Sequence, residues 1–254
     1  MNGNPGCCAA GHPAADGFHP HGQTRMVGEI QVYDSRPLSG SVKGILILFP
    51  DGFGLASHNQ LLADMFAERG WTTIIPDYFE GDAVPISVLE RDQSRPLDEQ
   101  FDLKLWLSRH PHESVERHAK DLYEHVHSSN DNLGIAVAGY CFGGKYALRA
   151  SSWPGVHVAL AFHPSFVERD DIAGAPVEPG CRTFVGLAEN DEMVPKTLGA
   201  DISCWAAEAS RTITQRVFPH VGHGFAARPA ATAKTEMEQF REAFEFACAA
   251  LEGS

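Results

Sequence analysis

Short apolar runs alternate along most of this chain with longer segments in which apolar residues recur at helical spacing. The runs at 44–49 and 135–140 are continuously apolar, which is typical of strands covered on both faces of a sheet. Residues 29–33 instead alternate between polar and apolar, as an edge strand does. Further strands are predicted at 71–75, 156–162, 183–187 and 213–218.

Helical spacing predicts a first helix that begins at Ser57 and ends near Gly70, two helices at 96–108 and 113–128, and a short helix at 145–151. The last predicted helix carries an apolar stripe made of Met237, Phe240, Phe244, Cys248 and Leu251. Strands that alternate with helices predict an α/β fold with a mostly parallel, doubly wound sheet and helices on both faces.

The first part of the chain differs from the rest. Residues 1–27 are polar and rich in Gly, Pro and His, so we expect a loosely ordered lead-in. His12, His19 and His21 are candidate metal ligands, but their irregular spacing favours a solvated tail. Residues 28–254 are predicted to form a single domain, because the chain of 254 residues, 43% of them hydrophobic, can bury one large core.

Charge and cysteine usage narrow the function classes. The net charge is −13, and basic stripes are absent, so nucleic acid and anionic membranes are not expected as partners. The six cysteines lack metal-binding spacing, and the adjacent pair Cys7 and Cys8 lies in the lead-in. No signal peptide or membrane span is recognisable, and a reactive thiol is best kept in a reducing compartment, so we expect a cytoplasmic protein without a metal.

A nucleophile motif follows the apolar run at 135–138. Residues 139–144 read Gly-Tyr-Cys-Phe-Gly-Gly, which has the Gly-x-Cys-x-Gly layout of a nucleophile elbow, a sharp turn from a strand into a helix. Glycines suit this turn because a missing Cβ lets the neighbouring backbone pass close. Serine is the usual nucleophile there, so Cys141 predicts a thiol hydrolase on an α/β-hydrolase scaffold.

The other members of a catalytic triad are present in the required chain order of nucleophile, acid and histidine. Asp191 follows the strand at 183–187, and His223 follows the strand at 213–218, so both fall beyond the carboxyl ends of strands. His223 would share the Cys141 proton and later protonate the leaving group, and Asp191 would hold the imidazole. Glu189 and Glu192 are alternative candidates for the acid, and His220 is the alternative candidate for the histidine.

An oxyanion that forms when the nucleophile attacks needs N–H donors already in place. The backbone N–H of Phe142, next to the nucleophile, is one predicted donor. The loop after the strand at 44–49 is expected to supply the other, through Gly52.

At these residues the chain resembles the dienelactone hydrolase family, the carboxymethylenebutenolidases, over roughly residues 29–250. The resemblance rests on the elbow, on Asp191, and on the segments Pro50-Asp51-Gly52-Phe53-Gly54, Pro76-Asp77-Tyr78-Phe79 and Gly222-His223-Gly224-Phe225. It implies a monomeric α/β-hydrolase that opens enol-lactones through an acyl-thioester without a cofactor. The Asp77-Tyr78-Phe79 form is similar to the eukaryotic-type branch of the family.

The chain departs from the bacterial pattern in the residues around the thiol. The resemblance implies a loop acid that pairs with an arginine and tunes thiol ionisation. Here the acid is Asp51, and Arg228 stands one position later than expected. An Asp51–Arg228 pair is therefore a hypothesis, with a surface arginine as its alternative. Glu80 and Asp82, placed beside the presumed pocket, would repel a substrate carboxylate.

Aromatic residues and one further histidine are candidates for the pocket wall. Phe53, Tyr78, Phe79 and Phe142 would supply an apolar wall or pack in the core. His163 ends the strand at 156–162 and would either line the pocket near Cys141 or pack at the strand end.

These observations predict a hydrolase that cleaves a small ester or enol-lactone through Cys141 and an acyl-thioester intermediate. A non-catalytic relative that binds a small ligand or senses oxidants through the same thiol is the alternative. Haloacid and epoxide hydrolases use a carboxylate nucleophile at the elbow, so Cys141 argues against them.

Overall fold

The computed structural model describes residues 19–89, 99–130, 133–174, 178–230 and 233–253. In these residues the chain forms an eight-stranded sheet in the order β1-β2-β4-β3-β5-β6-β7-β8. The strands are β1 (Gln23–Val27), β2 (Ile30–Ser35), β3 (Gly44–Phe49), β4 (Trp71–Pro76), β5 (Ile135–Tyr140), β6 (Val156–Phe162), β7 (Arg182–Ala188) and β8 (Ile213–Phe218). Pairing is antiparallel from β1 to β2 and from β2 to β4, and parallel at every other step.

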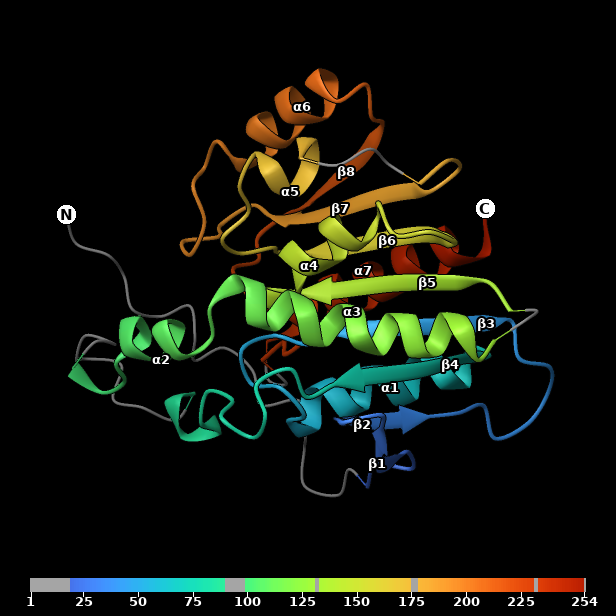
Figure 1. The fold of residues 1–254 in the computed structure, drawn as a ribbon. Helices are drawn as coiled ribbons and strands as arrows, with labels where there is room; N and C mark the ends of the chain where they lie inside the picture. The colour runs from blue at the N-terminus through green and yellow to red at the C-terminus, as the bar shows by residue number, and fades with distance from the viewer. Residues whose placement is uncertain (1–18, 90–98, 131–132, 175–177, 231–232, 254) are drawn as a thin grey trace.

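Helices cover both faces of this sheet (Figure 1). They are α1 (Ser57–Glu68), α2 (Leu103–Arg109), α3 (His112–Ser128), α4 (Phe142–Ala150), α5 (Asp170–Ala173), α6 (Leu198–Glu208) and α7 (Lys234–Glu252), with a 3₁₀ turn η2 (Ile86–Val88). Side chains of α1 and α7 pack on one face, and those of α3 and α4 pack on the other. The predicted mostly parallel sheet with helices on both faces is confirmed.

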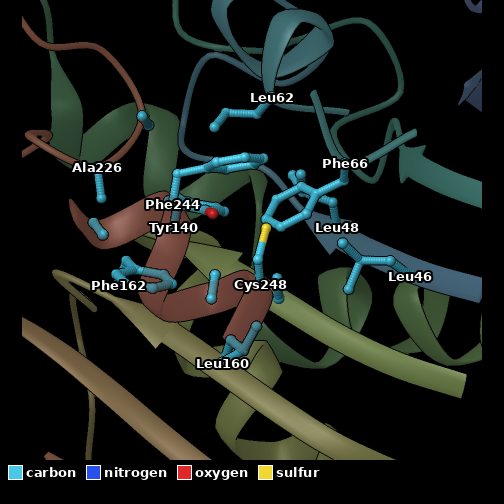
Figure 2. Close-up of a cluster of buried hydrophobic side chains, with 14 of the residues drawn as sticks. Leu46, Leu48, Leu62, Phe66, Tyr140, Leu160, Phe162, Ala226, Phe244 and Cys248 are labelled. Carbon is cyan, nitrogen blue, oxygen red and sulfur yellow. The ribbon is translucent and has the colours of Figure 1, made fainter. Parts of the chain in front are cut away.

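Alternate residues of the central strands supply the two halves of the core, because successive side chains of a strand point to opposite faces. Leu46 and Leu48 of β3 pack with the α1 and α7 side, where Figure 2 shows them near Phe66, Phe244 and Cys248. Residues 47 and 49 of the same strand pack with the α3 and α4 side. The strand is therefore apolar at every position, as the sequence pattern indicated.

Each predicted strand is present, but β1 was missed and lies within the predicted lead-in. Its first four residues are exposed, so burial imposes no apolar alternation on them. The strand is held by its antiparallel register with β2, from Gln23 opposite Asp34 to Val27 opposite Ile30. The expectation of a loosely ordered segment up to residue 27 is therefore wrong for residues 23–27.

Some helix boundaries also differ from the prediction. The helix expected at 96–108 begins at Leu103 after Asp102, whose side chain accepts a hydrogen bond from the N–H of Leu105 at 2.8 Å. Residues 96–98 lie outside the described residues. The helix after the elbow begins at Phe142, ahead of the predicted residue 145, because its two glycines belong to its first turn. Helices α5 and α6 were not predicted.

Two properties of the described residues bear on membrane and metal binding. None of their helices combines the length and apolar character needed to cross a membrane. No group of three or more His, Cys, Asp or Glu side chains among them is arranged to hold a metal ion. Cys7, Cys8 and His12 lie outside the described ranges.

Candidate active site

The candidate catalytic residues meet at one edge of the sheet, where the parallel strands have their carboxyl ends. Cys141 follows β5, Asp191 lies beyond β7, and His223 lies beyond β8. Asp51 follows β3, which is hydrogen-bonded to β5. The parallel order of these strands brings together residues that are far apart in the chain.

Cys141 has a strained backbone at the turn from β5 into α4, with φ 50° and ψ −114°. The surrounding glycines permit this turn. A Cβ at Gly139 would lie 2.1 Å from the carbonyl oxygen of Gly143, and one at Gly143 would lie 2.1 Å from that of Phe49. A Cβ at Gly144 would lie 2.5 Å from Cβ of Pro164. The elbow therefore excludes any larger residue at these three positions.

His223 and Asp191 form a buried hydrogen-bonded pair. Nδ1 of His223 lies 2.9 Å from Oδ2 and 3.1 Å from Oδ1 of Asp191. The backbone N–H of Met193 also donates to Asp191 Oδ1 at 2.9 Å, which orients the carboxylate. The competing residues Glu189 and His220 are exposed and contact each other instead, at 3.4 Å.

The thiol of Cys141 and the imidazole of His223 are coupled by a hydrogen bond and by charge. Burial opposes ionisation of the thiol, but the charge and the hydrogen bond of His223 outweigh it, so the pKa of Cys141 lies below its ordinary value. Burial also opposes the imidazolium, yet Cys141 and Asp191 together raise the pKa of His223 to about 10. Both shifts favour a thiolate–imidazolium pair, and Cys141 stands at the positive N-terminal end of α4.

Asp51 is fully buried and held by four donors. His58 Nε2 lies 2.9 Å from Oδ2, Asn59 Nδ2 donates to Oδ1 at 2.8 Å, and the backbone N–H of Phe53 donates to Oδ1 at 3.0 Å. Arg228 Nε donates to Oδ2 at 3.4 Å. Burial would raise the pKa of Asp51, but His58, Arg228 and Asn59 bring it well below its ordinary value, so the carboxylate is charged.

The hypothesised Asp51–Arg228 pair is therefore present, and the alternative of a surface arginine is wrong, since Arg228 is only 2% exposed. The guanidinium also lies over the ring of Phe53, 5.4 Å from its centroid. Sequence reasoning missed His58 and Asn59. Their position in the sequence could have revealed them as partners of Asp51, because they follow it by seven and eight residues, at the start of α1.

His163 contacts Cys141 from the protein interior. It is 1% exposed, and its Nδ1 accepts a hydrogen bond from the backbone N–H of Cys141 at 3.1 Å. Its ring lies edge-on to that of His223, with 4.9 Å between centroids. Burial and the charges of His223 and Arg228 bring the pKa of His163 well below its ordinary value, so the imidazole is neutral. Of the two expectations for this residue, packing at the strand end is the one the geometry favours.

A pocket opens beside Cys141 and is lined mostly by apolar side chains. It is lined by Gly52, Phe53, Val84, Val88, Phe101, Leu103, Trp106, Cys141, Phe142, Ser165, Phe166, Met193, His223 and Arg228. The residues on α2, around η2 and in the loops after β6 and β7 were missed, because their sequence carries no motif. Apart from Arg228, the pocket places a mostly apolar wall around the thiol and the imidazole, as small-molecule sites usually do.

The expected oxyanion donors lie in this same lining. Phe142 is the first residue of α4, where a backbone N–H has no acceptor within the helix. Gly52 follows β3, and its carbonyl accepts a hydrogen bond from the N–H of Val84 at 2.8 Å, which fixes the orientation of the loop. Both residues therefore face the space next to Cys141.

Comparison with known proteins places the chain in a family. The model of the dienelactone hydrolase family matches residues 30–250. The chain belongs to the dienelactone hydrolase family. It is 30% identical to dienlactone hydrolase 1 of Gibberella moniliformis over 241 residues, covering 91% of this chain and 86% of that protein. It is 24% identical to the carboxymethylenebutenolidase homolog of Mus musculus over 219 residues, covering 85% and 78% respectively.

Solved structures confirm the fold. A Klebsiella pneumoniae structure assigned as a dienelactone hydrolase aligns with a TM-score of 0.69 at 16% identity, covering 92% of this chain and 98% of that one. The predicted α/β-hydrolase fold of the dienelactone hydrolase family is thereby confirmed. Members of this family are carboxylic ester hydrolases, so the predicted enzyme class is confirmed as well.

Of the two expectations for Tyr78 and Phe79, the wall of the pocket or the core, the geometry favours the core. Both are buried and neither belongs to the pocket lining, and Phe79 packs 5.3 Å from Phe142 between ring centroids. The hydroxyl of Tyr78 donates to the carbonyl of Pro50. Successive residues at the end of a strand point alternately toward the pocket and toward the core. The motif alone does not reveal which of its side chains point toward the pocket.

Glu80 and Asp82 also lie away from this pocket. Both side chains are exposed, and neither belongs to the lining. Arg109 Nε donates to Asp82 at 2.7 Å, and His110 Nε2 lies 3.0 Å from the same carboxylate. The expected repulsion of a substrate carboxylate therefore has no basis, because Asp82 is paired on the outside of α2.

Proposed function

We propose that this protein hydrolyses a small carboxylic ester or enol-lactone, with Cys141 as nucleophile, His223 as acid and base, and Asp191 as the residue that orients His223. The observation that carries the proposal is the pairing of Cys141 with His223 at a strained elbow that faces an apolar pocket. The hydrogen bond of His223 to buried Asp191 completes a nucleophile–base–acid chain.

In the first half of the reaction the thiolate sulfur of Cys141 attacks the ester carbonyl carbon. The oxyanion accepts hydrogen bonds from the N–H groups of Phe142 and Gly52. The bond from carbon to the leaving oxygen then breaks, and the His223 imidazolium gives its proton to that oxygen. The result is an acyl-thioester and a neutral imidazole, and in a lactone the released hydroxyl or enol stays attached to the acyl group.

In the second half His223 takes a proton from water, and the resulting hydroxide attacks the thioester carbonyl. The carbon–sulfur bond breaks, the sulfur leaves as a thiolate, and the imidazolium is restored beside it. The product is a carboxylic acid. No external oxidant, metal or cofactor is needed to balance either half.

Asp51 and Arg228 are proposed to adjust the pKa of the Cys141 thiol, and Arg228 also to contact the substrate. After burial and the contribution of His223, the negative charge of Asp51 raises the pKa of Cys141, and the positive charge of Arg228 lowers it. Arg228 also lines the pocket, next to an otherwise apolar wall. We therefore infer a substrate with an apolar or conjugated acyl part.

We further propose that the enzyme works as a monomer in the cytoplasm, since its reactive thiol needs a reducing compartment. Residues 28–254, extended by the hairpin strand β1, would form the catalytic domain. Tyr78, Phe79 and His163 would support the site from the core and would not touch the substrate.

The proposal is tested by turnover of p-nitrophenyl esters and a set of lactones, including dienelactones, followed by mass spectrometry of the Cys141 peptide. We expect hydrolysis, a trapped acyl group on Cys141, and no turnover in Cys141→Ala. Cys204→Ala is the matched control, because Cys204 is an exposed cysteine far from the pocket lining. Undiminished turnover in a folded Cys141→Ala variant would exclude this mechanism. A complete lack of turnover in the wild-type protein would favour the non-catalytic alternative.

A further inference from the structure

Ser165 contacts the nucleophile at two points. Its side-chain Oγ lies 3.6 Å from Sγ of Cys141, and its backbone N–H donates to the carbonyl of Cys141 at 2.9 Å. The residue is 3% exposed and lines the pocket. Its hydroxyl is therefore at the reacting atom while the rest of the residue is held by the protein.

The backbone on both sides of Ser165 is strained. His163 has φ 38° and Phe166 has φ 57°, although neither is a glycine. Left-handed conformations of such residues persist where the surrounding structure over-determines them, and they cluster at functional sites. Pro164, which lies between these two residues, packs against the elbow, close to Gly144.

Residues in the segment 163–165 contact the backbone N–H, the carbonyl and the sulfur of Cys141. His163 Nδ1 accepts from its backbone N–H, Ser165 N–H donates to its carbonyl, and Ser165 Oγ meets its sulfur. The backbone of Ser165 is thus tied to that of the nucleophile, and its Oγ lies 3.6 Å from the sulfur.

We propose that Ser165 is a further catalytic residue, whose hydroxyl donates a hydrogen bond to the Cys141 thiolate and sets its reactivity. This rests on the proposed function, in which the sulfur is a thiolate. A thiolate has no proton to donate, so the hydroxyl must be the donor across the 3.6 Å contact. Ser165 then stabilises the thiolate as a neutral donor next to the charged His223.

The charged and titratable groups around this sulfur come from several elements. They are His223 with Asp191 behind it, Asp51, Arg228, His163 and Tyr78. None of these groups belongs to Ser165, so the Ser165→Ala variant retains all of them. A change in thiol ionisation in Ser165→Ala is therefore attributable to the lost hydrogen bond.

A hydrogen bond to the thiolate has two opposed effects on reactivity. It increases the fraction of thiolate below the pKa, and it makes each thiolate less nucleophilic. Loss of the bond is expected to raise the pKa of Cys141 by about one unit, which is about tenfold less thiolate at low pH. The remaining thiolate gains about threefold in nucleophilicity, since thiolate reactivity rises with basicity at a Brønsted slope of about 0.45.

The experiment measures the rate of reaction of Cys141 with a neutral aromatic disulfide from about pH 4 to about pH 10. The mixed disulfide on the Cys141 peptide is quantified by mass spectrometry. Ser165→Ala is expected to react about threefold more slowly than wild type at low pH and about threefold faster above both pKa values, so that the two profiles cross.

Two variants serve as controls. Ser165→Thr keeps the hydroxyl and is expected to keep the wild-type profile. Ser35→Ala removes another buried hydroxyl, one that donates to Asp64 far from the pocket, and is expected to leave the profile unchanged.

Overlapping profiles of Ser165→Ala and wild type would overturn the proposal. A parallel fall at all pH values in Ser165→Ala would also overturn it, because that outcome indicates lost packing. The assay reads the chemistry of Cys141 without turnover. Turnover that persists in Cys141→Ala would thus refute the proposed function, whereas crossing profiles would still support the hydrogen bond from Ser165.

Discussion

The guanidinium Nε of Arg228 lies 3.4 Å from the carboxylate Oδ2 of Asp51, and both side chains are almost completely shielded from solvent. The two residues are 177 positions apart in the chain. This pair joins the loop after β3, which contains Gly52, to the segment that follows His223.

Removal of Arg228 is expected to destabilise the fold. Arg228→Met leaves Asp51 buried with fewer compensating charges, which should lower the free energy of unfolding by about 3 kcal/mol. Arg169→Met is the matched control, since Arg169 pairs with Glu208 at 2.8 Å on the surface. It should cost less than about 1 kcal/mol. Urea denaturation measures both, and equal effects would contradict a structural role for the buried pair.

The pH dependence of thiol modification follows from the coupling of Cys141 to His223. The pKa of Cys141 is lowered, so its alkylation by iodoacetamide should persist below the ordinary thiol pKa and fall only as the pH drops through the lowered value. Glutathione alkylated in parallel supplies the unperturbed reference. A midpoint for Cys141 equal to that of glutathione would refute the thiolate–imidazolium pair.

Stability should also depend on this pair at alkaline pH. The folded-state pKa of His223 is raised to about 10, above its ordinary value, so its contribution to stability is complete below about pH 6.5. The contribution is lost as the pH rises through about 10. His223→Gln should therefore flatten the decline in melting temperature over this range, and an unchanged slope would argue against the raised pKa.

Asp191 is expected to act through the tautomer and orientation of His223. Asp191→Asn should lower kcat by a factor on the order of 10³ to 10⁴, as the amide favours the wrong imidazole tautomer. Glu189→Gln is the control, since Glu189 is exposed and faces His220. Steady-state kinetics on p-nitrophenyl acetate compares them, and a larger loss in Glu189→Gln would reassign the acid.

The pocket wall on α2 is expected to determine the selectivity of the enzyme for the length of the acyl chain. Leu103→Ala should lower kcat/KM for p-nitrophenyl hexanoate about fivefold relative to acetate, because a lost apolar contact is worth about 1 kcal/mol. Leu105→Ala, on the same helix but 54% exposed and outside the lining, should leave the ratio unchanged. A shift in both variants, or in neither, would move the acyl site elsewhere.

The elbow glycines are expected to resist substitution. Gly139→Ala would place a Cβ 2.1 Å from the Gly143 carbonyl oxygen, and should cost more than about 3 kcal/mol or prevent folding. Gly81→Ala meets nothing within 4 Å and bears only the strain of φ 82°, about 1–2 kcal/mol. Expression and thermal melting distinguish the two, and a well-folded, active Gly139→Ala would contradict this geometry.

The sequence by itself determined the order of strands β2 to β8 and of helices α1 to α4 and α7, and the motif around Cys141. Buried strands must be apolar at every position, and the elbow must contain glycine, so both leave a local pattern. The edge strand β1 leaves none, because most of its residues face solvent and its place is set by pairing with β2.

Only the tertiary structure decided which polar and aromatic residues reach the thiol. It buried Tyr78 and Phe79 behind the pocket, turned Asp82 outward to Arg109, and brought Ser165 to the sulfur of Cys141. These outcomes depend on the direction of each side chain at the end of a strand. That direction is set by packing between segments far apart in the chain, which no local pattern records.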